Sequence, residues 1–329
     1  MKKVIEKREL VVLNRFGDIV RGTFHKTRDD NSAEQSSLNR ESRIGILFLN
    51  SLSPTRAGKG DSSVYWADSF AEAGYPSFRI DLSGFGDSAG DPPDELLSFI
   101  NRGGYAKEVS AKAKEIRERF DLSGVVLVGL CAGAVSAMYA AVTVAECRGL
   151  ILLDPYFSLP LVTRSRTWER LSDRLQQGSV RRLIKIASNR VKAVRAVFRR
   201  DVLPSNSNLP LLSCLKQVAS AKLPIIIFKV ASPARDHEFD YISYALGQAG
   251  QVNEVMIKTI EGADHTFANR VGRRAVLDEA KKWLSRWFPL VRQQSSCSRM
   301  SERGCTLTKI SDEDYENSEP IGHALEGRG

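Results

Sequence analysis

The stretch that most constrains the fold lies near the middle of the chain, where an apolar run gives way at once to a small-residue segment. Val125–Val128 are consecutive, mostly β-branched residues, which is typical of a buried strand. Gly129-Leu130-Cys131-Ala132-Gly133 follows directly, and the small residues after it predict a tightly packed helix. A strand that turns sharply into a helix presents the residue at the turn at the carboxyl edge of a sheet.

Cys131 stands at this turn, between two glycines. Glycine allows a sharp turn without side-chain clashes. The N-terminus of the following helix offers free N–H groups and a positive dipole end, which favour a thiolate. Taken alone, Gly-x-Cys-x-Gly leaves two interpretations open, because a cysteine after a strand is often only a small buried hydrophobic residue. The rest of the chain has to decide between them.

Strands and helices alternate along most of the sequence. Alternating polarity predicts a hairpin over residues 4–13 and 19–27. Apolar runs predict further strands, which are expected at 43–50, 75–81, 125–128, 150–155, 223–230 and 254–260. Periodic segments predict helices, which are expected at 64–73, 105–120, 132–141 and 272–288. The pattern predicts an α/β fold with a mostly parallel, doubly wound sheet. Ligands of such sheets bind at the carboxyl ends of the strands.

The composition is that of a soluble globular chain. Of 329 residues, 42% are hydrophobic and 26% are charged, and no apolar run is long enough for a membrane span. The first residues hold no apolar signal core, and five cysteines without framework spacing are typical of a reduced protein, so we expect a cytoplasmic location. No Cys/His cluster has metal-ligand spacing, so neither a metal nor another cofactor is expected.

The formal net charge of +9 is concentrated in one region. In residues 160–220 arginine and lysine greatly outnumber acidic residues, and apolar residues recur at helical spacing, so we predict a basic helical insertion. It could be a solvated helix face, a lid that attracts an anionic substrate, or a docking surface for an acidic protein or a membrane. No nucleic-acid-binding motif is present. The core would then comprise residues 1–159 and 221–291, and the polar residues 292–329 predict a disordered tail.

Polar groups with catalytic potential follow three of the predicted strands in the order nucleophile, acid, histidine. Cys131 follows one strand, an acidic loop follows the strand at 223–230, and His265 follows the last strand. The carboxyl ends of parallel strands meet at one edge, so these groups can converge there. His25, in the hairpin, is expected to be a surface residue without a catalytic role. Asp81 and Asp87 bracket a glycine-rich turn and are expected to fix loop hydrogen bonds.

The sequence resembles the α/β-hydrolases of the serine-aminopeptidase-like group, most closely the exosortase-associated hydrolases and their relatives. The likeness covers about residues 40–155 and 220–290 and is carried by short motifs: Phe48-Leu49-Asn50, Arg56, residues 78–88, residues 129–133 and Asp264-His265-Thr266-Phe267. Members of this subgroup often carry Cys at the nucleophile position. The usual His-Gly after the third strand is replaced by Asn50-Ser51.

The resemblance implies an α/β-hydrolase fold and assigns roles. Cys131 would attack an acyl carbonyl, and His265 would take the thiol proton. The backbone N–H groups of Leu52 and Ala132 would form the oxyanion hole. Asp236 is the expected acid, since it closely follows the strand at 223–230. The rival carboxylates are Glu238, Asp240 and Asp154.

A cysteine nucleophile would form a thioester acyl-enzyme, which a thiol, an amine or water can resolve. We therefore expect a hydrolase or acyltransferase that acts on the ester or thioester of a small-molecule or carrier-bound acyl substrate. The basic insertion would suit an anionic carrier such as coenzyme A or a phosphopantetheine arm. No nucleic-acid partner is expected, and membrane contact is not predicted. The alternative is a catalytically inactive binding or scaffolding module that uses the basic insertion.

Overall fold

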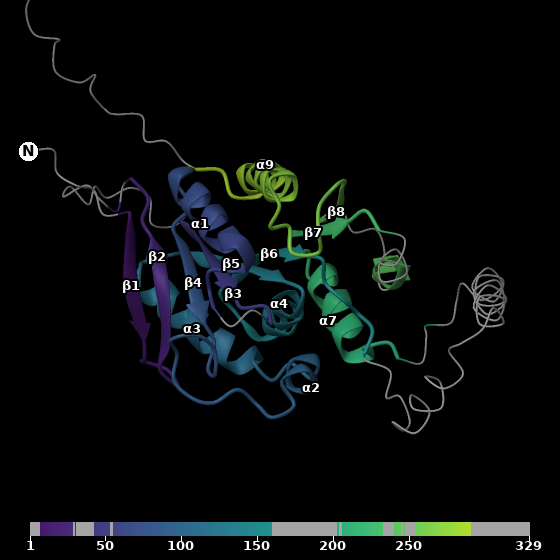
Figure 1. Cartoon of the computed structure of the whole chain (residues 1–329), viewed down its shortest axis with the longest axis horizontal. Coiled ribbons are helices and arrows are strands. Elements are labelled where there is room, and N and C mark those ends of the chain that lie inside the picture. Colours follow the sequence, from purple (N-terminus) through teal and green to yellow (C-terminus); the bar gives the residue numbers. More distant parts are fainter. Residues whose placement is uncertain are drawn as a thin grey trace, which may run out of the picture. The chain divides into compact units, whose positions relative to one another are not determined.

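A computed structural model of the chain describes residues 7–28, 30, 43–52, 55–159, 203, 206–232, 240–244, 246–247 and 254–290. Within these residues, eight strands form one sheet in the order β1-β2-β4-β3-β5-β6-β7-β8 (Figure 1). β1 pairs antiparallel with β2, and β2 pairs antiparallel with β4, whereas all other neighbours are parallel. The strands are β1 (Arg8–Leu13), β2 (Val20–His25), β3 (Ile44–Leu49), β4 (Ser77–Asp81), β5 (Gly124–Leu130), β6 (Cys147–Leu153), β7 (Ile225–Val230) and β8 (Val255–Ile260).

Helices cover both faces of the sheet (Figure 1). α1 (Ser62–Glu72) and α9 (Arg270–Trp287) lie on one face, and α3 (Ala106–Arg119), α4 (Ala132–Thr143) and α7 (Leu209–Ser220) lie on the other, with the short α2 (Leu96–Asn101) beside α4. A 3-10 turn, η3 (Lys59–Asp61), precedes α1. None of the helices in the described part of the chain is both long enough and apolar enough to cross a membrane.

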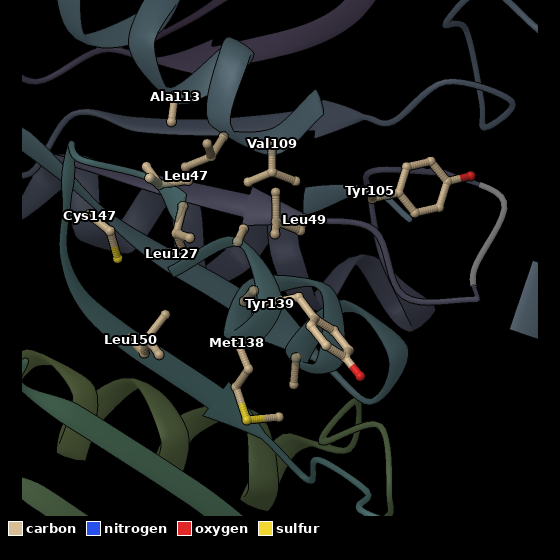
Figure 2. Close-up of a cluster of buried hydrophobic side chains, with 14 of the residues drawn as sticks. Leu47, Leu49, Tyr105, Val109, Ala113, Leu127, Met138, Tyr139, Cys147 and Leu150 are labelled. Atoms are coloured by element: carbon tan, nitrogen blue, oxygen red, sulfur yellow. The ribbon is translucent and has the colours of Figure 1, made fainter. Parts of the chain in front are cut away.

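The larger hydrophobic core lies between the sheet and helices α3 and α4. Figure 2 shows Leu47 and Leu127 of the sheet close to Val109 of α3, with Met138 of α4 nearby. All four side chains are fully buried, and each such burial stabilises the fold by about 1.5–3 kcal/mol. β3 and β5 lie at the centre of the sheet with helices on both faces, which is why their sequences are apolar at nearly every position.

The predicted α/β-hydrolase architecture is confirmed, with two differences. Residues 209–220, expected within the basic insertion, form α7, whose buried leucines pack in the same core as α4. The core therefore resumes before residue 221. α2 was not expected, because its six residues are too short to show a helical period. The rest of the predicted insertion, apart from residues 203 and 206–208, and the predicted tail lie outside the described residues.

Candidate active site

Cys131 occupies a sharp turn between β5 and α4. Its backbone angles are φ 53° and ψ −113°, a combination that costs a residue with a side chain about 1–3 kcal/mol. Its N–H donates to the carbonyl of Leu153 on β6 at 2.8 Å, and its carbonyl accepts from Ala134 at 3.0 Å. The strained residue is therefore held on one side by the neighbouring strand and on the other by the first turn of the helix.

The two glycines of the motif allow close backbone approach. A Cβ at Gly129 would lie 2.2 Å from the carbonyl oxygen of Gly133, and one at Gly133 would lie 2.5 Å from the carbonyl oxygen of Asn50. Both distances are far below any real carbon contact. The motif thus needs glycine so that α4 can start against the end of β3, and the positive φ falls on Cys131 itself.

His265 lies in the loop between β8 and α9, and local contacts fix that loop. The Asp264 carboxylate accepts from the backbone N–H of Thr266 at 2.7 Å, and the Asp264 carbonyl accepts from Phe267 at 2.9 Å. Phe267 is fully buried in the core beneath α9. Asn269 then caps α9 by accepting from Gly272 at 2.7 Å. This arrangement orients the residue between Asp264 and Thr266 without consuming its side chain.

Asp154 follows β6, the strand next to the one that carries Cys131. Its backbone also has positive φ, 42°, and its N–H donates to Phe228 at 2.7 Å. Asp154 is fully buried, and its Oδ2 is hydrogen-bonded to Nδ1 of His265. The bond holds the imidazole in one orientation and leaves Nε2 for another partner.

The imidazole of His265 interacts with both the Asp154 carboxylate and Cys131. Hydrogen bonding to Asp154, and then interaction with Cys131, raises the pKa of His265 to about 9, against the opposing effect of partial burial. The raised pKa favours the positively charged imidazolium. Asp154 and Cys131 are thus the two side chains that affect His265 most.

The four carboxylates considered from the sequence fare differently. Asp236 and Glu238 lie outside the described residues, and Asp240 begins a short helical stretch. Of the two carboxylates that the structure describes, Asp154 is hydrogen-bonded to His265. Its sequence signal was its position directly after the apolar strand ending at Leu153, the same signal that pointed to Cys131 and His265. The family position pointed instead to the loop after β7.

The two residues expected to form an oxyanion hole lie at the ends of neighbouring elements. Ala132 is the first residue of α4, where backbone N–H groups have no partner within the helix. Leu52 lies in the loop after β3, and its side chain is exposed. β3 and β5 are adjacent in the sheet, so the two residues follow neighbouring strands at the same edge.

A large cavity, the α2-side cavity, lies beside α2 and the start of α7. Its volume is about 710 Å³, and its wall includes Leu96, Leu97, Leu159 and Pro210. The Tyr139 hydroxyl donates to the carbonyl of Asn101 in this wall at 2.7 Å. Burial and the charges of Cys131 and Tyr139 raise the pKa of Tyr156. The remaining residues that line the cavity are Asp94, Glu95, Ser98, Asn101, Arg102 and Asn208.

His25 is not the surface residue that the sequence suggested. Its side chain is fully buried; Nε2 accepts from Nε of Arg79 at 2.8 Å, and Nδ1 lies 2.7 Å from Oδ1 of Asp68. Because an arginine only donates, the ring proton sits on Nδ1 and is donated to Asp68. The expectation was wrong because α1 packs against β2, so the ring of His25 is enclosed between Asp68 of α1 and Arg79 of β4.

No group of three or more His, Cys, Asp or Glu side chains in the described ranges is arranged to hold a metal ion. Cys131, Cys147 and Cys214 are free thiols. Burial raises the pKa of Cys147 to about 12, so this thiol stays protonated and unreactive.

Comparisons with known proteins identify the family and agree with the fold. The model of the alpha/beta hydrolase family matches residues 46–279. The hypothetical protein PA2218 from Pseudomonas aeruginosa has a similar structure, with a TM-score of 0.55 at 15% identity over 87% of this chain and 95% of that chain. The Pyrococcus furiosus esterase PF2001 gives 0.53 at 13% identity over 85% and 91% of the two chains.

A dienelactone hydrolase from Anabaena variabilis gives a TM-score of 0.52 at 14% identity over 86% of this chain and 100% of that chain. At these identities the structural likeness establishes the fold alone. No curated protein matches the sequence.

Proposed function

Because the chain belongs to the α/β-hydrolase family and is a hydrolase, we propose that it cleaves or transfers the acyl group of an ester or thioester through Cys131, His265 and Asp154. The observation that carries the proposal is the position of His265, whose Nδ1 is hydrogen-bonded to Asp154 and whose pKa is raised by both Asp154 and Cys131. Nucleophile, imidazole and carboxylate in this order are the parts of a catalytic triad.

The proposed reaction proceeds in two steps. The Cys131 thiolate attacks the acyl carbonyl carbon, the bond to the leaving alcohol or thiol breaks, and His265 gives that leaving group its proton. Water or another acceptor then loses a proton to His265 and attacks the thioester, which releases the acyl product and restores the thiolate. Asp154 holds the imidazole in orientation and stabilises its positive charge throughout.

The α2-side cavity is suited to an apolar acyl group. Its volume falls within the range of small-molecule sites, and its leucines and proline offer an apolar wall. Asp94 and Glu95 also line it, and these carboxylates disfavour an anionic group in that space. An anionic carrier would have to bind elsewhere. The predicted basic insertion, most of which lies outside the described residues, remains the expected place for it.

A free thiol nucleophile requires reducing surroundings, so we propose a cytoplasmic location. The three free cysteines of the described residues are compatible with it.

The direct test combines turnover with trapping. The wild-type chain is incubated with p-nitrophenyl esters and acyl thioesters of increasing length, and the acyl-enzyme is identified by intact-mass spectrometry after acid quenching. We expect turnover and an acyl adduct on Cys131. Cys131→Ala should lack both, whereas Cys214→Ala, which removes a half-buried free thiol on α7, should keep both. Unchanged turnover in Cys131→Ala would reject the assignment. A chain that turns over no ester, and whose thiol reacts slowly with iodoacetamide at pH 7, would support the inactive binding module instead.

A further inference from the structure

A buried carboxylate, Asp81, ties down both flanks of the segment that contains the expected oxyanion donor Leu52. Asp81 is the last residue of β4 and is fully buried. Its Oδ1 accepts from Nδ2 of Asn50 at 3.1 Å. Its Oδ2 accepts from Nη1 of Arg56. One oxygen therefore holds the residue before Ser51 and Leu52, and the other holds the arginine that comes after them.

Further bonds fix each flank. The Asn50 side-chain oxygen accepts from the N–H of Leu82 at 2.7 Å, so Asn50 is bound to β4's end through both ends of its amide. The Asn50 carbonyl lies against Gly133 in the first turn of α4. The position of Asn50 is thereby defined relative to both Asp81 and the turn that carries Cys131.

Arg56 is held through Nε and Nη1 of its side chain and through its backbone carbonyl. Nε donates to Oγ1 of Thr23 at 3.0 Å, and Nη1 also donates to Asp87 at 2.7 Å. The Arg56 carbonyl accepts from Nη1 of Arg79 at 3.0 Å. Arg79 in turn donates a hydrogen bond to His25, which donates one to Asp68. The arginine is thus anchored to β2, to β4 and to the glycine-rich turn.

This amount of buried charge needs an explanation beyond stability. Buried ion pairs are weak contributors to stability, because the cost of desolvation offsets their attraction, but removal of one partner is strongly destabilising. Such networks can fix one geometry at the expense of alternatives. Here the geometry that is fixed is that of a segment beside the nucleophile.

We propose that Asp81 and Arg56 are positioning residues that hold the N–H of Leu52 toward the acyl oxygen of the reaction at Cys131. The inference rests on the proposed function for its catalytic meaning. Neither side chain touches substrate. Both act by fixing the residues on either side of Ser51 and Leu52, so that the N–H groups of Leu52 and Ala132 face one oxyanion without reorganisation during the reaction.

The test compares two reactions of the same thiol. Acylation by a p-nitrophenyl ester passes through an oxyanion, whereas alkylation by iodoacetamide displaces iodide and forms none. Arg56→Met should lower kcat and the acylation rate by about 100- to 1000-fold, the range seen when one oxyanion donor is lost, with a smaller effect on KM. The alkylation rate should change less than about twofold. Arg56→Lys, which keeps the charge but not the fork, should recover part of the loss.

A matched control is Arg15→Met. This substitution removes the same charge as Arg56→Met, but Arg15 lies in the exposed loop after β1, where it pairs with Glu118 at 2.7 Å. It should leave both rates unchanged. In Asp81→Asn one side-chain oxygen remains, so it can accept a hydrogen bond from only one of Asn50 and Arg56. The loss of acylation rate in the double variant with Arg56→Met should therefore be smaller than the two single losses combined. Equal losses in acylation and alkylation, or no loss in either, would overturn the proposal.

A readout independent of turnover separates this inference from the proposed function. Hydrogen exchange of the peptide covering residues 50–56 should accelerate in Arg56→Met, while the peptide covering 129–135 stays protected. If the wild type turns over no ester, the proposed function fails, and faster exchange still supports the tether. Unchanged exchange at residues 50–56 overturns the tether whatever the turnover.

Discussion

His265 and Asp154 are 111 residues apart in the chain, yet Nδ1 of the one is hydrogen-bonded to Oδ2 of the other. Asp154 follows β6 and His265 follows β8, so the contact spans β7, the strand between them in the sheet. The loop after β7, where Asp236 lies, was the expected source of the acid. The contact makes the identity of the acid a question that substitutions can answer.

Asp154→Asn should lower kcat/KM for a good ester by about 100- to 10,000-fold, because an amide neither holds the same imidazole tautomer nor stabilises its positive charge. Asp236→Asn and Asp240→Asn are the matched comparisons, since each removes one of the rival carboxylates. Steady-state kinetics on the three variants decide the matter. A loss in Asp236→Asn as large as that in Asp154→Asn would return the acid to the loop after β7.

The raised pKa of His265 predicts how stability changes with pH. The pKa of His265 is about 9 in the folded chain, against an ordinary histidine pKa of 6.5, so the folded chain binds this proton more tightly than the unfolded one. The stabilisation is complete below pH 6.5 and is lost as the pH rises through 9. The free energies of unfolding of wild type and His265→Gln, measured by urea denaturation from pH 6 to pH 10, should converge at high pH. Parallel curves would contradict the shift.

His25 predicts the opposite dependence. Burial and the neighbouring Arg79 lower the pKa of His25 to about 4, so below pH 6.5 the unfolded chain binds a proton that the folded chain does not. Stability should therefore decline as the pH falls from 6.5 toward 4, and His25→Gln should show a shallower decline. The comparison with wild type in the same buffers removes the contribution of the carboxylates that titrate in this range. An equal slope in both proteins would show that His25 takes no part in it.

Gly133→Ala should damage the site more than the fold. A Cβ there would lie 2.5 Å from the Asn50 carbonyl oxygen, so the end of β3 must move away from α4. Such overpacking costs about 1–3 kcal/mol, measurable by thermal denaturation. Activity should fall further than this loss of stability explains, because a displaced Asn50 would also displace the nearby Leu52, the expected oxyanion donor. Gly247→Ala is the control, since nothing lies within 4 Å of its Cβ position. Full activity in Gly133→Ala would show that the contact is adaptable.

Leu97→Trp tests the α2-side cavity. The larger side chain should fill part of the 710 Å³ space and shift preference toward shorter acyl groups. We expect the ratio of kcat/KM for a long-chain to a short-chain ester to fall by about tenfold or more, in line with the selectivity of apolar pockets. Leu10→Trp, at an exposed position on β1, should leave the ratio unchanged. An unaltered ratio in Leu97→Trp would place the acyl group elsewhere.

Most of the fold could be predicted because its strands are apolar runs bounded by turn residues. β3, β5 and β7 are buried on both faces, and their sequences are nearly continuous apolar runs. The positions of Cys131 and His265 followed from the same signal, since each comes after a strand. α7 was missed because a basic stretch precedes it, and its buried leucines show their role only once α4 is known to lie beside them.

The contacts of single polar side chains could not be predicted in the same way. Several carboxylates follow strands, and only the arrangement in space shows that Asp154 contacts His265. Likewise, the alternation in β2 does not reveal that β4 covers its second edge and buries His25. Asp81 was correctly expected to fix loop hydrogen bonds, but its partners Asn50 and Arg56 come from a different segment.

The Cys131 N–H bond to Leu153 joins the ends of β5 and β6, the two paired strands that Cys131 and Asp154 follow, whereas His265 lies in the loop after β8. Gentle warming should therefore displace the imidazole while β5 and β6 remain joined. The temperature at which catalysis is lost would then lie below the temperature at which circular dichroism reports melting, and cooling after a brief exposure between the two would restore the enzyme.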